Sequence, residues 1–315
     1  MRIGRYAKDT DPGRRRRRNE DAFVLQPPLF AVADGMGGAQ AGELASRLAA
    51  AALIAEGDTD PGGDAEKRLV DLIQTANQRI YERSSEDAGV SGMGTTMTAA
   101  LVKNDLVSFG HVGDSRAYLI RNGTLDQLTE DHSLVAELLR SGKLSPEEAE
   151  THPQRSVITR ALGTDPDVDV DTFSIGACPD DIFLLCSDGL TNMVDDEVIL
   201  RIVEGSRIDL EAAARALIVE ANQAGGDDNI TVVFFEISDG SGDETVRAQA
   251  VPEPAPRDDD EDTLSPLDAV PVIRVDDGPV AAAEPRSGAK RLLVTIGVVA
   301  LLALLLVIVL LGLAR

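Results

Sequence analysis

Five aspartates that are far apart in this sequence each stand beside an apolar run. Asp34 ends LFAVAD, Asp114 ends VSFGHVGD and Asp188 follows IFLLCS. Asp21 precedes AFVL, and Asp228 precedes NITVVFF. One such residue is most simply a turn residue, since Asp-Gly is a common turn signal. Five carboxylates gathered at the ends of core strands are costly to bury unless a cation neutralises them.

A site built only from oxygen ligands predicts a hard divalent cation, Mg²⁺ or Mn²⁺. Zn²⁺ prefers His and Cys, and the three histidines, His111, His132 and His152, show no ligand spacing. Two hard cations about 3.5 to 4 Å apart can generate hydroxide and clamp a phosphoryl group. The carboxylates therefore indicate metal-assisted hydrolysis.

The elements that must position these carboxylates follow from the hydrophobic periodicity. Helical spacing predicts helices at 41–57, 64–84, 196–205 and 209–226. Strand patterns occur at 29–34, 95–105, 106–114, 116–129, 181–189 and 229–237. Asn-Gly within RNGT at 121–124 predicts a hairpin between antiparallel neighbours. Helices that lie outside antiparallel sheets indicate an α+β fold.

Composition divides the 315 residues into three parts. Residues 1–238 form the predicted globular domain, and residues 239–289 form an acidic, Pro- and Ala-rich segment that we expect to be a disordered linker. Residues 290–315 are predicted to be a transmembrane anchor, because 292–314 carry no charge. A helix of that length, at about 1.5 Å per residue, covers roughly 35 Å, against a hydrocarbon core of about 30 Å.

Charges beside the apolar run predict the orientation of the anchor. Three basic residues within 286–291 precede it and only Arg315 follows it, so the positive-inside rule keeps the N-terminal domain cytoplasmic at the cell membrane. The two cysteines, Cys178 and Cys186, suit a reducing compartment. The net charge of −24 argues against a nucleic-acid partner.

Eight ordered motifs within residues 5–238 resemble those of a known family. They are RRRNEDAF, ADGMGG with AGELAS, GMGTTMTAALV, HVGDSRAYL, LTEDHS, PQRSVITRALG, LLCSDGL and DDNITVVF. Together they resemble the metal-dependent protein serine/threonine phosphatases of type 2C, specifically the bacterial membrane-anchored kind. The resemblance implies a four-layer α-β-β-α sandwich, in which two antiparallel sheets are flanked by helix pairs.

The resemblance also implies a role for each carboxylate. Asp34 would be the catalytic residue that bridges two metal ions, while the Gly35 carbonyl holds one of them. The other ligands it implies are Asp188 and Asp228 on the first ion, Glu20 and Asp21 on waters of the second, and Asp114 with Asp188 on a third. It therefore implies two or three Mn²⁺ or Mg²⁺ ions per domain.

The run RRRRR at 14–18 contains the residue to which the resemblance assigns phosphate binding. The family's phosphate-binding arginine stands five residues before the metal aspartate, which selects Arg16 as a catalytic and substrate-binding residue. Because the arginines are adjacent, Arg17 or Arg18 can take the same role. From composition alone, the simpler interpretation is a solvated basic patch that touches anionic lipid near the anchor.

Residues 133–162 resemble the family's flap, in which Arg155 and Arg160 are candidate substrate contacts. A solvated surface is the equal alternative for both arginines. We expect 94–96 to pack beneath the site. Asp131 and His132 either lie behind the metal ligands or belong to an ordinary turn.

Ala39 departs from the family pattern, in which bacterial relatives usually have a His that protonates the leaving alkoxide. We therefore expect a working but acid-impaired enzyme that removes phosphate from Ser and Thr of phosphorylated proteins at the membrane and opposes Ser/Thr protein kinases. The alternative is a catalytically weak, membrane-tethered pseudophosphatase that binds phosphoproteins. A two-metal nuclease is disfavoured by the acidic composition.

Overall fold

The computed structural model describes residues 1–37, 40–57, 63–150 and 152–239. The chain divides into two units, 1–248 and 249–315, and every feature below belongs to the first. Apart from Asp239, the predicted linker and membrane anchor lie outside the described residues, as does Ala39. Among the described helices, none is long and apolar enough to cross a membrane.

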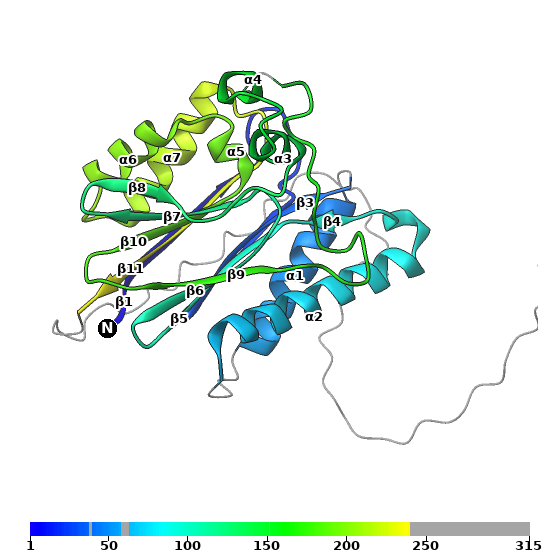
Figure 1. Ribbon diagram of the computed structural model, residues 1–315, viewed down its shortest axis with the longest axis horizontal. Helices are drawn as coiled ribbons and strands as arrows, with labels where there is room; N and C mark the ends of the chain where they lie inside the picture. The colour runs from blue at the N-terminus through cyan, green and yellow to red at the C-terminus, as the bar shows by residue number, and fades with distance from the viewer. Residues whose placement is uncertain (38–39, 58–62, 151, 240–315) are drawn as a thin grey trace, which may run out of the picture. The chain divides into compact units, whose positions relative to one another are not determined.

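Two antiparallel sheets form the centre of the domain (Figure 1). The first has the strand order β1 (Arg2–Asp11), β11 (Ile230–Ser238), β10 (Ile182–Cys186), β7 (Arg116–Arg121) and β8 (Thr124–Gln127). The second has the order β2 (Asp21–Gln26), β3 (Leu29–Met36), β5 (Met97–Lys103), β6 (Leu106–Val112) and β9 (Asp171–Gly176), with β4 (Gly94–Thr95) paired to β3.

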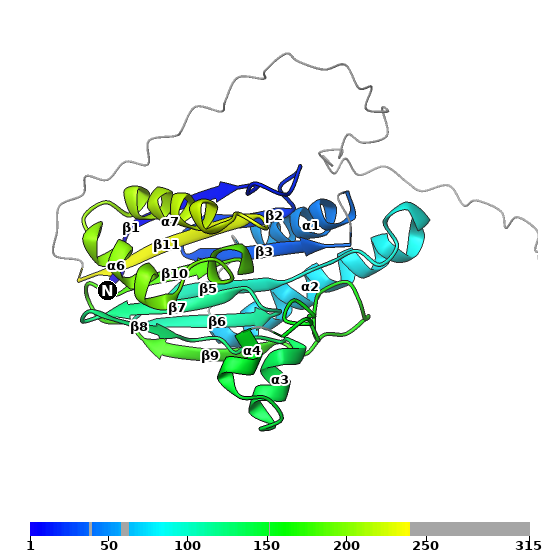
Figure 2. The same ribbon diagram turned by 90° about the horizontal axis from the view of Figure 1, so that it is seen from above.

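Helix pairs cover the outer faces of the sheets (Figures 1 and 2). Helices α1 (Ala41–Gly57) and α2 (Ala65–Glu86) pack on the second sheet, whereas α6 (Asp196–Gly205) and α7 (Leu210–Ala224) pack on the first. The short helices are η1 (Ala88–Val90), α3 (Leu134–Arg140), α4 (Pro146–Glu150) and α5 (Asp188–Thr191). The predicted α+β sandwich of two antiparallel sheets flanked by helices is confirmed.

Strand alternation explains the layers. On β3, Ala31 and Ala33 face the core under α1 and α2, whereas Phe30 and Val32 face the core between the sheets. Successive side chains of a strand point to opposite faces, so an apolar run without polar alternation is buried on both sides. The small alanines let the helices approach the sheet closely.

Stacked phenylalanines join the two sheets. Phe30 of β3 stacks on Phe235 of β11 with ring centroids 4.4 Å apart, and Phe235 stacks on Phe183 of β10 at 4.9 Å. Phe183 in turn meets Phe109 of β6 at 5.8 Å. Aromatic pairs of this kind add about 0.5–1.5 kcal/mol each beyond their buried area. They hold the sheets in one register, which fixes how the strand ends of one sheet meet those of the other.

The hairpin predicted at RNGT is confirmed, because β7 pairs with β8 and both Asn122 and Gly123 have positive φ. Strands β1, β2 and β9 are absent from the predicted list. All three lie at sheet edges; β1 and β9 carry many polar residues and β2 is short, so their hydrophobic pattern is weak.

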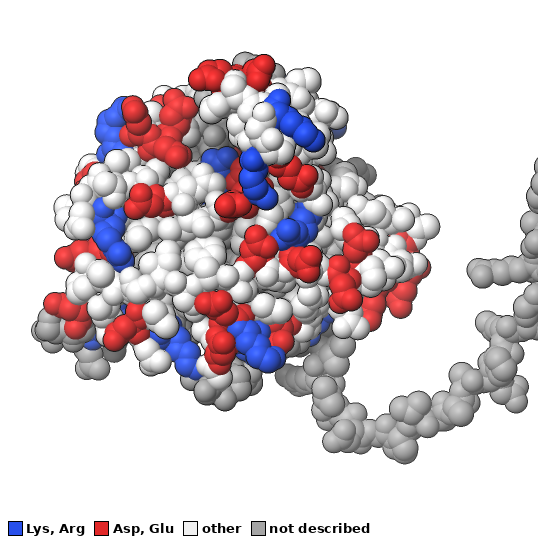
Figure 3. All heavy atoms as spheres, viewed as in Figure 1, with Lys and Arg blue, Asp and Glu red and all other residues white. Residues whose placement is uncertain are grey.

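On the face shown in Figure 3, acidic and basic side chains are interspersed.

Candidate active site

The five aspartates come together at one end of the sandwich. Asp21, the first residue of β2, pairs directly with Asp34 on β3. Asp114 stands two residues after β6, Asp188 two residues after β10 and Asp228 two residues before β11. The charges of the other four all act on the carboxyl of Asp34. The predicted convergence of these residues is therefore present in the structure.

Burial and mutual repulsion perturb the acids of this cluster. The pKa of Asp21 is raised to about 7, that of Asp188 to about 6 and that of Asp114 to about 8, with burial as the largest cause and neighbouring carboxylates next. The pKa of Asp34 is raised well above its ordinary value for the same reasons. A bound cation reverses this effect by favouring the charged form.

Three buried carboxylate oxygens in the cluster have no hydrogen-bond partner among the described residues. They are Oδ1 of Asp21, Asp114 and Asp188. A fourth such atom, Asp227 Oδ1, differs because Arg15 Nε lies 2.9 Å from it in an ion pair. Buried anionic oxygens without donors are unfavourable unless a cation satisfies them. The donor set, all hard oxygen, fits Mg²⁺ or Mn²⁺.

Within the described residues, no group of three or more His, Cys, Asp or Glu side chains is already arranged as a metal site. The unpartnered oxygens and the raised pKa values are the features of this cluster that indicate cations.

Hydroxyl and amide groups hold the aspartates in place. Ser187 Oγ donates to Asp21 Oδ2 at 2.8 Å and so ties the end of β10 to the start of β2 across the two sheets. Asn192 Nδ2 donates to Asp188 Oδ2 at 2.9 Å. Sequence reasoning missed both residues. Their only sequence signal is proximity to Asp188, in CSDGLTN.

The segment 94–96 supports the backbone of Asp34, as predicted. Thr95 Oγ1 donates to the Asp34 carbonyl at 2.8 Å, and the Asp34 N–H donates to Thr96 Oγ1 at 2.9 Å. Thr96 Oγ1 is also hydrogen-bonded to Ser115 Oγ, next to Asp114. The threonines thus link two of the metal-ligand candidates.

Gly35 lies where the backbone is too crowded for a side chain. Its N–H donates to the Glu20 carbonyl at 3.2 Å, and a Cβ at this position would collide with the carbonyls of Gly42 and Glu20. A Cβ on Gly42 would in turn meet the Glu20 carboxylate. These glycines bring Glu20 beside the cluster, where burial raises its pKa and Arg16 opposes the shift.

Arg16 contacts the cluster directly, since its Nη2 donates to Asp228 Oδ2 at 2.7 Å. Its neighbours point elsewhere: Arg14 Nε donates to the Asn222 carbonyl, and Arg18 lies 3.6 Å from Glu43. Arg17 makes no hydrogen bond or ion pair with the described residues. Among the arginines that spacing left open, Arg16 is therefore the one that the structure places against the carboxylate cluster.

The two flap arginines differ. Arg160 Nη1 donates to Asp171 Oδ1 at 2.6 Å and lies 3.1 Å from His132 Nε2, so it is held in a side-chain network. Arg155 is exposed, and its side chain has no partner among the described residues. Only Arg155 is thus free to reach a substrate without breaking an ion pair.

His132 is hydrogen-bonded to the backbone directly after β6. The Gly113 N–H donates to His132 Nδ1 at 3.0 Å, so the ring proton lies on Nε2, which faces Asp171 Oδ2 at 3.1 Å. Burial lowers the pKa of His132, so the ring is neutral at neutral pH. Of the two alternatives for LTEDHS, the structure supports, for His132, a place behind the metal-ligand candidate Asp114. Asp131 forms an ion pair with Arg116.

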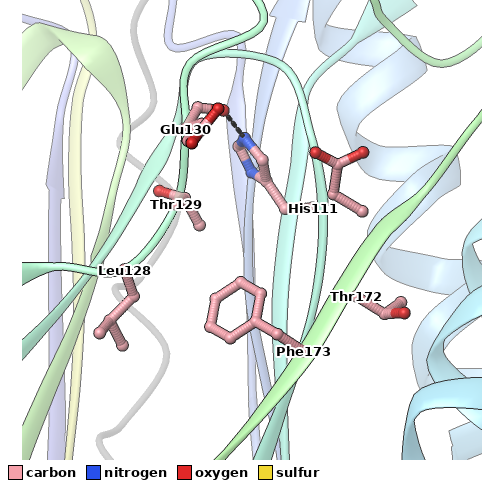
Figure 4. Close-up of a pocket in the computed structure, with 7 residues that line it drawn as sticks. His111, Leu128, Thr129, Glu130, Thr172 and Phe173 are labelled. Carbon is pink, nitrogen blue, oxygen red and sulfur yellow. Dashed lines mark hydrogen bonds between the residues drawn. The ribbon is translucent and has the colours of Figure 1, made fainter.

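A hollow of about 340 Å³ lies beside this histidine (Figure 4). It is lined by His111, Leu128, Thr129, Glu130, Asp171, Thr172 and Phe173. His111 Nε2 donates to the Glu130 carbonyl at 3.0 Å. Burial and His132 lower the pKa of His111 to about 4. None of the predicted site residues lines the hollow.

The sequence and the fold of this domain have counterparts among known proteins. Residues 14–206 match the family model described as Protein phosphatase 2C. The chain belongs to the protein phosphatase 2C family. It is therefore a protein phosphatase, and the predicted enzyme class is confirmed.

Relatives of this phosphatase carry names that agree. The serine/threonine phosphatase stp of Listeria monocytogenes serotype 4b (strain F2365) is 44% identical over 243 residues, which cover 72% of this chain and 93% of that protein. A crystal structure of the serine/threonine phosphatase PstP/Ppp of Mycobacterium tuberculosis matches with a TM-score of 0.72 and 41% identity, covering 75% of this chain and 99% of that one.

A further crystal structure concerns the cofactor. It contains the catalytic domain of the phosphatase PstP in complex with two manganese ions, and it matches this phosphatase with a TM-score of 0.70 and 39% identity over 75% of this chain and 99% of that one. The prediction of Mn²⁺ or Mg²⁺ as cofactor is confirmed at the level of the family.

Proposed function

We propose that residues 1–238 hydrolyse phosphoserine and phosphothreonine in proteins and use two or three Mn²⁺ or Mg²⁺ ions. The single observation that carries this proposal is the group of five aspartates at one end of the sandwich, three of which have a buried oxygen without a hydrogen-bond partner among the described residues. The names of the relatives support the substrate class, and the manganese complex of PstP supports the metal.

We assign the ligands of each metal ion to particular residues of the chain. Asp34, Asp188 and Asp228, with the Gly35 carbonyl, would hold the first ion. Glu20 and Asp21 would hold the second through water, and Asp114 with Asp188 a third. When bound, such ions lower the pKa of water and neutralise charge on the phosphoryl group.

Arg16 binds and orients the phosphate in this proposal. A guanidinium has five N–H donors, and Asp228 engages Arg16 through Nη2 alone. The remaining donors suit a bidentate contact with phosphate oxygens. Holding the phosphate in line with the attacking water is a large part of catalysis in phosphoryl transfer.

We further propose that the anchor at 290–315 places this activity at the cytoplasmic face of the cell membrane, where it opposes Ser/Thr protein kinases. The uncharged run at 292–314 and the basic residues before it support the location. Membrane fractionation of cells that express the full chain, or the chain without 292–314, tests it. Recovery of both forms in the soluble fraction would overturn it.

A manganese titration of phosphopeptide hydrolysis by the full chain tests the enzyme against the pseudophosphatase. We expect Mn²⁺-dependent release of phosphate from a phosphothreonine peptide, lost by at least 100-fold in Asp34→Asn. If the full chain binds the peptide at every metal concentration but releases no phosphate, the phosphoprotein-binding alternative, which Ala39 favours, is correct.

A further inference from the structure

The arginine run lies in the loop that connects β1 to β2, and the backbone of this loop is held at both ends. The Arg14 N–H donates to the Gly226 carbonyl at 2.7 Å. The side chain of Asn229 donates to the carbonyls of Pro12 and Arg18 and accepts from the N–H of Glu20. These hydrogen bonds therefore hold the loop backbone in place beside the carboxylate cluster, and the arginine side chains extend from this backbone.

Three arginines of this loop flank Arg16 and are open to solvent; Arg15, Arg17 and Arg18 are called the arginine surface here. Arg15, 72% exposed, is paired with Asp227, and Arg18, 53% exposed, lies 3.6 Å from Glu43. Arg17 is exposed and has no partner among the described residues. Exposed ion pairs are worth about 0–1 kcal/mol, so an incoming anion can replace them.

The arginine surface is positively charged, whereas the chain as a whole is negatively charged. The chain has 30 Lys and Arg against 54 Asp and Glu, so an anionic substrate meets a molecule of net charge −24. The face in Figure 3 intersperses both signs. Five consecutive arginines beside the catalytic cluster therefore provide a local attraction that the rest of the composition opposes.

We propose that the arginine surface binds a second phosphate or an acidic side chain of the substrate, close to the phosphoresidue that is hydrolysed. This proposal rests on the phosphatase function and on Arg16 as the ligand of the scissile phosphate. An extended substrate advances about 3.3 Å per residue, so a second anion one or two residues away lies roughly 3 to 7 Å from the first. Guanidinium groups on either side of Arg16 match phosphate and carboxylate bidentately. The preferred substrates are thus segments with clustered phosphates or acidic residues.

The test compares two phosphopeptides of one sequence, carrying either a single phosphothreonine or a second phosphate two residues away. Initial rates are measured with the full chain and Mn²⁺. We expect kcat/KM to be about tenfold higher for the doubly phosphorylated peptide through a lower KM. Because surface charges are screened by salt, the preference falls as NaCl rises from about 50 to 200 mM.

The informative variant is Arg17→Gln with Arg18→Gln, in which we expect the ratio between the two peptides to fall to about one or two. Its matched control is Arg201→Gln with Arg215→Gln. Arg201 is exposed without a partner in the described residues, and Arg215 is 59% exposed and 3.6 Å from Glu211, so the pair mirrors Arg17 and Arg18. The control removes the same charge and keeps the preference.

An unchanged ratio in the Arg17/Arg18 variant, or an equal loss in the control, overturns the proposal. In another outcome, the wild-type chain shows no preference between the peptides, while its activity depends on phosphatidylserine vesicles and on Arg17 and Arg18. That result assigns the arginine surface to membrane binding and also overturns the proposal. If the full chain hydrolyses neither peptide, the phosphatase function fails instead. Binding of the same peptides to the Asp34→Asn full chain, by fluorescence anisotropy, still decides the surface.

Discussion

At the scale of single residues, the site is a balance between buried carboxylates and very few positive groups. Asp34 is surrounded by four other aspartates, while Arg16 is the one arginine of the run that contacts the cluster within the described residues. This imbalance explains both the unpartnered oxygens and the requirement for cations. It also predicts that residues which move charge or protons here have large effects on the rate.

Ala39 is one such residue, because the family resemblance implies a proton donor for the leaving group at its position. We expect Ala39→His to increase the hydrolysis of a phosphoserine peptide about tenfold or more, since general acid catalysis contributes about 10²–10⁴. An aryl phosphate has a good leaving group and needs little help. Its rate, measured in parallel, should change much less, and an equal effect on both substrates would contradict this role.

Arg16 is the second residue whose substitution we expect to have a large effect on the rate. Hydrogen bonds between charged groups are worth about 1.5–3 kcal/mol, so we expect Arg16→Ala to raise the KM for an aryl phosphate about 10- to 100-fold. Arg201→Ala, an exposed arginine on α6, is the control. Steady-state kinetics with Mn²⁺ measure both. A KM in Arg16→Ala that matches the control would return the assignment to Arg17 or Arg18.

At the scale of elements, antiparallel pairing explains why the acids meet. The start of β2 lies beside the end of β3, and the end of β10 lies beside the start of β11. The hydrogen bond from Ser187 to Asp21 then closes the gap between the sheets. The segment that follows β8 is joined to this end of the sandwich by His132, which binds the backbone of Gly113 next to Asp114.

Removing this brace should loosen Asp114. His132→Ala leaves the buried Gly113 N–H without an acceptor, at a cost of about 1–3 kcal/mol, and we expect a lower melting temperature together with a right-shifted Mn²⁺ activation curve. His152→Ala, in the segment after α4, is the control. Destabilisation without any change in the manganese dependence would show that His132 is only structural.

At the scale of the whole molecule, the acid cluster links stability to pH and to metal. The raised pKa values of Asp21 and Asp114, about 7 and 8, mean that the folded protein holds protons that the unfolded chain releases. Their stabilising contribution is complete below about pH 4 and is lost as pH rises through 7 and 8. The buried histidines act in the opposite direction, but only below about pH 6.5.

The effect of the aspartates on stability is therefore separated from that of the histidines between pH 7 and 9. In a chelator, we expect the melting temperature to fall across this range, by the equivalent of about 1–3 kcal/mol. Mn²⁺ should reduce or reverse the fall, because cations bind the ionised carboxylates. Asp114→Asn, which removes one of the raised groups, should flatten the slope. Metal-free stability that rises from pH 7 to 9 would contradict this account.

The sequence by itself determined the elements and the candidates. The apolar runs of β3, β10 and β11 and the periodicity of α1, α2, α6 and α7 are local properties, so they could be predicted from neighbouring residues. The aspartates were recognisable because each stands at the start or the end of an apolar run. Strands β1 and β9 could not be predicted in this way, because their polar residues become strands only through pairing at the sheet edges.

Only the tertiary structure decided which residues act together. The choice among adjacent arginines, the supporting roles of Ser187 and His132, and the engagement of Arg160 by Asp171 depend on contacts between positions up to 212 residues apart. Local sequence carries no information on such distances. Burial, which shifts the pKa values of the acids and makes cations necessary, likewise arises only when the two sheets close on each other.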